Sequence, residues 1–285
     1  MTPVDLALVV VASFLAGLAG SYLGIGGGIF LVPFLTLGIR VDLPVAVATS
    51  LVGVIATSSG AASVYVRDRL ANLRVGMFLE IATTLGAIVG ATLAVFVEPR
   101  VLFLVFAAVL LYSAAYMART RETARERAYR PVRDSRLAAR LDLASIYYDH
   151  EDQGVYRYRV ARPGAGLAAG SVAGGLSGLL GVGGGFVLVP AMNAVMGVPM
   201  KPAVATSNLM LGVTAAASAF IYYSRGLVNP TLASMVIVGV FSGTYLGTRL
   251  LLKAKPRRIR FAFSIALAAI GVLMGLRGLD VAVVP

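Results

Sequence analysis

The chain has 285 residues, of which 58% are hydrophobic and 13% are charged, whereas in a soluble domain about a quarter of the residues are charged. Its formal net charge of +12 would suggest nucleic acid, but the arginines stand between long apolar runs, where basic residues set membrane topology, so we expect no nucleic-acid partner. The absence of cysteine excludes disulfides, thiolate catalysis and cysteine metal sites.

The apolar residues form eight segments, which predict an all-α polytopic protein of a cell inner membrane, because apolar stretches of about 18 residues or more are typical of transmembrane helices. The first and fifth segments exceed the roughly 20 residues that a simple span needs. The N-terminus has no basic residue ahead of its apolar run, so we expect no cleaved signal peptide. The predicted segments are residues 4–38, 43–66, 75–97, 101–118, 164–198, 202–223, 230–252 and 259–276.

A polar linker, residues 119–163, separates the fourth and fifth segments and carries eleven arginines and seven acidic residues. Its composition to about residue 143 predicts helix, and the remainder is expected to be loop. A solvated cytoplasmic connector is the simpler interpretation, and a regulatory or partner-binding role is the alternative. His150 stands here among acidic residues, which favours a solvated side chain over a metal ligand. The predicted units are the first repeat (1–118), the linker (119–163) and the second repeat (164–285).

The two halves of the chain align without a gap when the sequence is shifted by 157 residues. The cluster Gly24-Ile-Gly-Gly-Gly28 falls on Gly181-Val-Gly-Gly-Gly185, and the Ala-Thr-Ser element at 48–50 falls on the one at 205–207. Identities in one register over so much of the chain indicate an internal duplication. The same register pairs Tyr65 with Tyr222, Asn72 with Asn229, Gly86 with Gly243 and Gly90 with Gly247.

The charges of equivalent loops predict that the two repeats are inverted. The loop after the second segment is basic in the first repeat, whereas the loop after the third segment is basic in the second repeat. Cytoplasmic loops retain Lys and Arg, so equivalent loops should face opposite sides. Inversion needs an odd number of crossings, and five follow if each long first segment breaks at its glycines and returns. With a cytoplasmic linker, 21 of the 25 basic residues lie inside and both termini lie outside.

The glycine clusters predict breaks in the helices, because each glycine costs about 1 kcal/mol within a helix. Within a bilayer, non-helical backbone is tolerated where it is buried in protein or lines a wet cavity, and the N–H groups that begin the next helix favour anions. Equivalent breaks in two inverted repeats indicate the central site of a transporter. The alternative is that the glycines only permit close helix packing. The candidate substrate-binding glycines are Gly24, Gly26, Gly27, Gly28, Gly181, Gly183, Gly184 and Gly185.

The paired Ala-Thr-Ser elements supply hydroxyl groups within otherwise apolar segments. A neutral site rich in donors would suit a small oxyanion and would avoid burying a fixed cation in the bilayer. The alternative is that the hydroxyls bond to their own helix backbone. The candidate substrate-binding side chains are Thr49, Ser50, Thr206, Ser207 and Asn208.

Glu80 lies in the third segment, and its counterpart in the second repeat is Ile237. An ionisable group in a membrane segment is a functional hypothesis, which makes Glu80 a candidate for proton coupling. Glu80 lies only about two turns from the charged loop, however, so the simpler interpretation is that its side chain reaches the interface. The sequence contains no Ser-His-Asp set, no metal-binding cluster and no nucleotide-binding motif. We therefore expect neither an enzyme nor a cofactor.

The segments Gly24-Ile-Gly-Gly-Gly-Ile-Phe-Leu-Val-Pro33 and Gly181-Val-Gly-Gly-Gly-Phe-Val-Leu-Val-Pro190, each followed by Ala-Thr-Ser, resemble the sulfite exporter TauE/SafE family of permeases. The resemblance covers residues 4–118 and 164–276. It implies a multi-pass protein of the cell membrane that moves sulfite, thiosulfate or an organic sulfur anion such as sulfoacetate. The linker is longer than the connector that the family leads us to expect, which leaves room for a regulatory addition.

The sequence thus predicts a secondary transporter of a small anion, in which one half moves against the other around the glycine breaks. Its expected partners are the anionic solute and the lipid bilayer, and a homo-oligomer stays open. The alternative is a non-transporting membrane scaffold or sensor that acts through residues 119–163.

Overall fold

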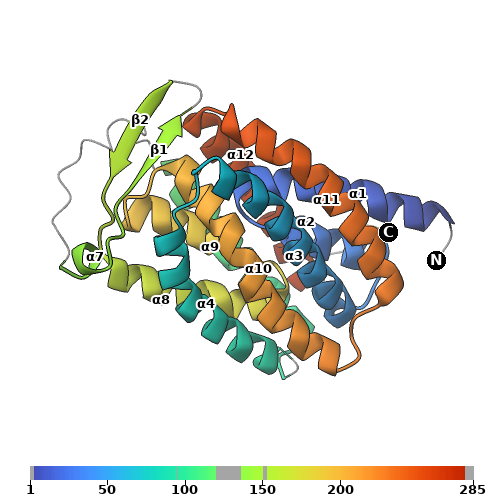
Figure 1. Ribbon diagram of the computed structural model, residues 1–285. Helices are drawn as coiled ribbons and strands as arrows, with labels where there is room; N and C mark the ends of the chain where they lie inside the picture. Colours follow the sequence, from blue (N-terminus) through green and yellow to red (C-terminus); the bar gives the residue numbers. More distant parts are fainter. Residues whose placement is uncertain (1–2, 95, 120–135, 150–152, 280–285) are drawn as a thin grey trace.

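The computed structural model describes residues 3–94, 96–119, 136–149 and 153–279, which form a helical bundle with one small β-hairpin at its end (Figure 1). Seven of the described helices are long and apolar enough to cross a membrane, which confirms the predicted helical polytopic protein. These seven are α1 (Pro3–Leu23), α3 (Leu43–Arg67), α4 (Leu73–Leu93), α5 (Pro99–Arg119), α10 (Met200–Ser224), α11 (Pro230–Leu252) and α12 (Pro256–Gly278).

The two long apolar segments are each divided at their glycines. The first runs as α1, α2 (Gly28–Pro33) and the π-helical turn η1 (Phe34–Gly38). The other runs as α8 (Pro163–Leu180), α9 (Gly185–Pro190) and the π-helical turn η2 (Ala191–Val195). Both π-helical turns follow a proline, which lacks the N–H group of a regular helical hydrogen bond. The piece after each break is about 16 Å long at 1.5 Å per residue, roughly half the thickness of a hydrocarbon core.

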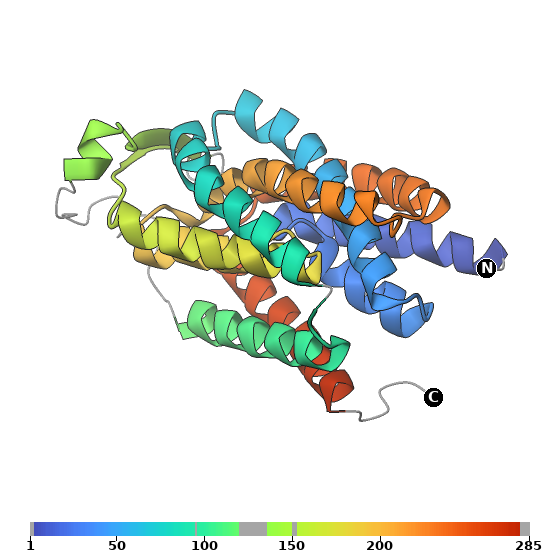
Figure 2. The same ribbon diagram turned by 90° about the horizontal axis from the view of Figure 1, so that it is seen from below.

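Helices from the two sequence repeats are interleaved. Helix α1 packs against α11, and its counterpart α8 packs against α4, so each repeat places its first helix against the third long helix of the other. Helices α3 and α10 pack together, and α5 lies beside α12 at one side of the bundle (Figure 2). The two repeats therefore do not form separate halves of the bundle. The sequence-based expectation that one half moves against the other assumed such separate halves.

Equivalent glycines allow the interleaved helices to approach closely. A Cβ atom added at Gly86 would lie 2.3 Å from the carbonyl oxygen of Ser171, and one added at Gly243 would lie 1.9 Å from that of Phe14. Both distances are far shorter than van der Waals contact, so the backbones touch at these points. Small residues at helix contacts are a usual means of packing helices in membranes, where little hydrophobic effect drives them together.

We expect Gly86→Ala to lower the stability of the protein by about 1–3 kcal/mol, because its new methyl group would overpack the contact with α8. Thermal unfolding in detergent measures the change. Gly164→Ala is the control, since a Cβ atom there meets nothing within 4 Å. Equal melting temperatures for the two variants would contradict the close contact.

The end of the linker forms an antiparallel hairpin of β1 (Ser145–Asp149) and β2 (Gly154–Tyr158), preceded by the short helix α7 (Arg136–Arg140). The expectation of loop in this part of the linker was therefore wrong. Side chains of Tyr147 and Tyr158 are buried, whereas Ile146 and Val155 point outward, and this alternation with period two is the strand signal that the prediction overlooked. Residues 120–135 and 150–152, including His150, lie outside the described residues.

The hairpin is anchored to both repeats. The Asn72 side chain, which caps α4, donates hydrogen bonds to the Leu143 carbonyl at 3.0 Å and to the Tyr158 hydroxyl at 3.1 Å. Lys201 Nζ, on α10, lies 2.6 Å from Asp149 Oδ1, and both side chains are only 2% exposed. Burial raises the pKa of Tyr158 to about 12, so its hydroxyl stays protonated at neutral pH.

We expect Asp149→Ala to destabilise the protein by about 3–5 kcal/mol, because it leaves a buried ammonium group without its carboxylate. Arg67→Ala, which removes the exposed partner of Asp68, should cost at most about 1 kcal/mol. Thermal unfolding in detergent compares the two variants. If both variants have the melting temperature of the wild type, the Asp149–Lys201 pair does not anchor the hairpin.

Candidate functional site

The glycine breaks have the same backbone geometry in both repeats. Three glycines of each break adopt left-handed backbone, with φ between 72° and 82°, a range that residues with a Cβ atom rarely occupy. The last of these three, Gly27 or Gly184, is the N-cap of the short helix that follows. These residues are glycine because the turn between two helices requires positive φ. The six are Gly24, Gly26, Gly27, Gly181, Gly183 and Gly184.

The two breaks meet in the core of the bundle. A Cβ atom added at Gly28 would lie 2.6 Å from the Gly181 carbonyl oxygen, and one added at Gly185 would lie 2.1 Å from the Gly24 carbonyl oxygen. The first N–H groups of α2 and α9 have no acceptor within their own helix, and both helices begin at this meeting point. The breaks thus bring two helix N-termini into one buried region.

Ser50 and Ser207 hold the breaks in place across the two repeats. The Ser50 hydroxyl donates to the Gly181 carbonyl at 2.5 Å, and the Ser207 hydroxyl donates to the Gly24 carbonyl at 2.8 Å. Ser50 also contacts the Val47 carbonyl of its own helix at 2.9 Å, so the hydroxyls bond across the repeats and not only within their own helices. In this conformation they satisfy carbonyl groups that a broken helix leaves without intrahelical donors.

The other predicted side chains differ in how well their polar atoms are satisfied. Thr206 Oγ1 accepts a hydrogen bond from the backbone N–H of Asn72 at 2.8 Å. The Asn208 amide donates to the Ser21 carbonyl at 2.9 Å, but its Oδ1 atom is buried without a hydrogen-bond partner. Thr49 Oγ1 is likewise buried without a partner. Thr49 and Asn208 thus retain polar atoms that could bind a ligand.

Ser177 is a residue that the sequence reasoning missed. Its hydroxyl is fully buried without a hydrogen-bond partner, and its Cβ atom would lie 3.4 Å from one added at Gly184. The 157-residue register could have found it, because it aligns Ser177 with Gly20 and so marks a hydroxyl that has no counterpart at the same position of the first repeat. Ser177 adds an unsatisfied polar group next to the second break.

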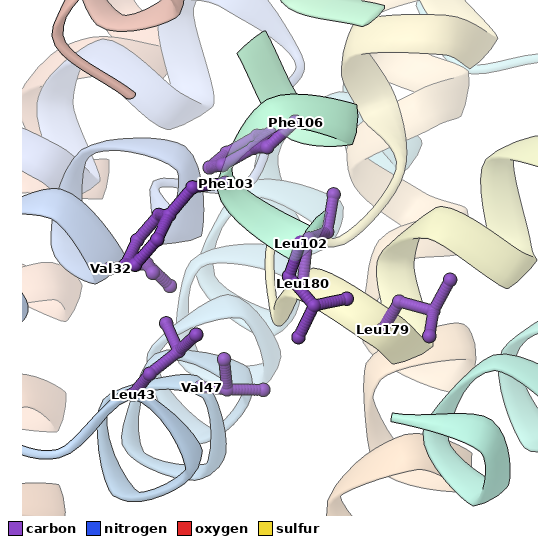
Figure 3. Close-up of a pocket in the computed structure, with 8 residues that line it drawn as sticks. All are labelled: Val32, Leu43, Val47, Leu102, Phe103, Phe106, Leu179 and Leu180. Atoms are coloured by element: carbon purple, nitrogen blue, oxygen red, sulfur yellow. The ribbon is translucent and has the colours of Figure 1, made fainter. Parts of the chain in front are cut away.

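The region between the breaks is closed by side chains. Val54 and Leu211, which are equivalent in the two repeats, are fully buried and lie over Gly26 and Gly183. A pocket beside the second break is lined only by apolar side chains, including Val47, and its volume of about 10 Å³ barely admits one water molecule (Figure 3). A larger groove of about 460 Å³ runs between α5 and the segment formed by α8, α9 and η2, and no break glycine lines it. The breaks are therefore occluded in this conformation.

Glu80 lies apart from the breaks, on α4 where it faces α10. Its Oε1 atom accepts hydrogen bonds from three threonine hydroxyls, Thr214 at 2.8 Å, Thr84 at 3.0 Å and Thr83 at 3.4 Å. The carboxylate is half-buried and satisfied by side chains within the bundle, rather than extended to the polar end of α4. Glu80 therefore joins α4 to α10 through Thr214.

The fold and the buried breaks define a multi-pass helical membrane protein whose core contains irregular backbone. Non-helical backbone at such depth is tolerated only where protein or a cavity surrounds it, and it is typical of transporters. The family model Sulfite exporter TauE/SafE matches residues 9–274, and the chain belongs to this family. The family is one of membrane transporters rather than enzymes, and the resemblance seen in the glycine motifs is confirmed.

Curated relatives match the chain over most of its length. It is 27% identical to the probable membrane transporter protein YunE of Bacillus subtilis, over 93% of this chain and 95% of the relative. It is 26% identical to a probable membrane transporter protein of Methanocaldococcus jannaschii, over 94% of this chain and 95% of the relative. It is 24% identical to the probable membrane transporter protein YdhB of Bacillus subtilis, over 85% of this chain and 89% of the relative. No solved structure matches the chain.

We expect Ser207→Ala to destabilise the protein by about 1–3 kcal/mol, because the buried Gly24 carbonyl loses its cross-repeat donor. Thermal unfolding in detergent measures the loss. Ser59→Ala is the control, since this exposed hydroxyl bonds only to the carbonyl of Ile55 one turn earlier. A Ser207→Ala protein as stable as Ser59→Ala would show that the serine does not support the break.

Proposed function

We propose that the protein is a secondary transporter that moves a small anion, namely sulfite, thiosulfate or an organosulfonate such as sulfoacetate, by alternating access. The observation that carries the proposal is the meeting of two glycine breaks, each of which begins a short helix in the buried core. The sulfite exporter description of the family supports a sulfur oxyanion as the solute.

An anion suits this region because helix N-termini offer free N–H groups and positive dipole ends. The side chains that contact the breaks are neutral, and Ser50 and Ser207 are close enough to exchange a carbonyl acceptor for a solute oxygen. Thr49, Ser177 and Asn208 add buried polar atoms that have no partner when the site is closed. A neutral site binds an anion without the cost of a buried, fixed cation.

Inverted repeats with about five passes each remain our proposal for the topology. The start of α4 lies beside the linker, because Asn72 donates a hydrogen bond to the Leu143 carbonyl. In the other repeat it is the end of the equivalent helix, α11, that lies beside the linker. Lys201 Nζ contacts both Asp149 of the linker and the carbonyl of Leu252 at the end of α11. In Figure 1, α1 begins at the end of the bundle away from the hairpin, whereas α8 begins beside it. Opposite directions of equivalent helices support inversion.

The fifth segment supports the proposed entry and return. Ala161, just before α8, donates its N–H to the Met196 carbonyl, just after η2, at 2.8 Å. The two ends of the broken segment therefore lie together, as a segment that enters, breaks and returns requires. Together with the basic residues near the linker, this geometry supports a cytoplasmic linker in an inner membrane and both termini outside.

Alternating access must involve bodies that combine both repeats, because α1 packs on α11 and α4 packs on α8. The closed state requires Val54 and Leu211 to cover the breaks. We propose that these pairs of helices move relative to α3 and α10, which uncovers the breaks on one side at a time.

The scaffold alternative rests on the hairpin, whose outward face exposes Ile146 and Val155. Such a face could contact a partner. The buried Asp149–Lys201 pair, however, ties the hairpin to the helices, which favours a part of the transporter over a free recruiting arm. Anion flux through the purified protein decides between these functions, because a scaffold would produce none.

We expect purified protein in liposomes to exchange internal unlabelled sulfite, thiosulfate or sulfoacetate for the labelled external anion, and Gly183→Ala to abolish the exchange. The new Cβ atom would strain a backbone with φ of 82° and lie 3.0 Å from Val54 Cγ1. Gly226→Ala is the matched control, since it imposes the same strain at φ of 71° in a loop with nothing within 4 Å. The proposal fails if the wild-type protein exchanges none of the three anions.

A further inference from the structure

A carboxylate surrounded by hydroxyl groups lies between α4 and α10. Besides the three hydrogen bonds to Glu80 Oε1, the Thr214 and Thr83 hydroxyls lie 3.2 Å apart, and both threonines are almost fully buried. The four side chains thus form one compact polar cluster between two helices that are long and apolar enough to cross a membrane. Ionisable groups in such positions are costly, which makes a purely structural role hard to justify.

The second repeat provides an internal comparison. At the positions equivalent to Glu80, Thr83 and Thr84, it has Ile237, Val240 and Phe241. Helix α11 packs on α3 as α4 packs on α10, and Val240 and Phe241 lie beside Gly53 and Gly60 of α3, so this contact forms without a polar cluster.

The threonine on the facing helix shows the same difference. Thr57 is the equivalent of Thr214, but its hydroxyl donates to the Gly53 carbonyl of its own helix at 3.0 Å. Thr214 instead reaches the carboxylate across the helix contact. A difference between two otherwise matched repeats points to a function that only one of them performs.

No cation balances the charge of Glu80 among the described residues of the helices that pack on α4. Helix α8 has no ionisable side chain. On α10, Lys201 pairs with Asp149, Tyr222 donates to the Gly178 carbonyl and Tyr223 is exposed.

On α4 itself, Arg74 pairs with Asp142 beside the linker. The carboxylate therefore has hydroxyl donors but no counter-charge, and taking up a proton would remove the cost of burying its charge. A proton needs no coordination shell, which suits a site whose donors already fill one carboxylate oxygen.

We propose that Glu80, with Thr83, Thr84 and Thr214, binds a proton that is moved in the same cycle as the anion. This inference rests on the proposed transport function and assigns its driving ion. Thr214 follows Ser207 on α10 by seven residues, so the two lie on one face about two turns, or ~10 Å, apart. Protonation changes the hydrogen bond between α4 and α10, and α10 carries the serine that holds the first glycine break.

The test uses the reconstituted full-length chain with whichever of sulfite, thiosulfate or sulfoacetate the wild type exchanges, and thiosulfate is preferred because it stays ionised near neutral pH. We expect an imposed pH gradient to drive accumulation by the wild type. Glu80→Gln should lose this accumulation but keep anion exchange, because the breaks are intact and exchange needs no net proton movement. Retained exchange also demonstrates that the variant is folded.

Two matched controls sharpen the result. Glu98→Gln changes an exposed carboxylate and should leave both activities unchanged. Thr214→Val should weaken gradient-driven accumulation, whereas Thr92→Val, which changes an exposed hydroxyl of α4 that bonds to the Ile88 carbonyl, should not. The proton assignment is overturned if Glu80→Gln accumulates the anion as the wild type does, or if a sodium gradient replaces the pH gradient as the driving force. Absence of exchange in the wild type would instead refute the proposed transport function.

Discussion

The structure depends on two left-handed glycine turns that are pressed against each other in the middle of an apolar bundle. A helix that stops within a membrane exposes carbonyl and N–H groups that lipid cannot satisfy. Here, Ser50 and Ser207 satisfy one carbonyl of each break from the opposite repeat. The close approach of Gly28 to Gly181, and of Gly185 to Gly24, leaves no room for a side chain at these positions. Each break is therefore packed against the other and hydrogen-bonded to the opposite repeat.

The helices that carry the breaks are interleaved between the repeats. The first helix of each repeat ends at a break in the centre of the bundle. Along its length it packs against a helix of the other repeat, α1 against α11 and α8 against α4. Glycines such as Gly86 and Gly243 make these contacts close. Any movement that opens the centre must therefore carry helices of both repeats together.

The polar groups of the core fall into two sets with different chemistry. The central set is neutral and contains backbone amides and hydroxyls, which suits an anion because it adds no fixed charge to the bilayer interior. The other set contains the Glu80 carboxylate and its three threonines, which suits a cation. Helix α10 contributes Ser207 to the first set and Thr214 to the second, so a single helix connects the two sets.

Much of this arrangement could be predicted from the sequence. Long apolar runs determine membrane helices because few other structures satisfy the backbone in lipid, and the glycine clusters mark the breaks because four glycines in five residues disfavour helix. The 157-residue register identified the equivalent residues. The hairpin was not predicted from the sequence, because the strand signal of Tyr147 and Tyr158 is short and lies in a polar linker.

The amino-acid sequence by itself determined the membrane helices, the duplication and the places where helices stop, since these follow from local composition and spacing. Only the tertiary structure decided that Ser50 and Ser207 bond to the opposite break, that Val54 and Leu211 close the centre, and that Thr214 reaches Glu80. These contacts join residues more than a hundred positions apart or depend on which helices pack together. No local pattern encodes such pairings, because they arise from the packing of the whole bundle.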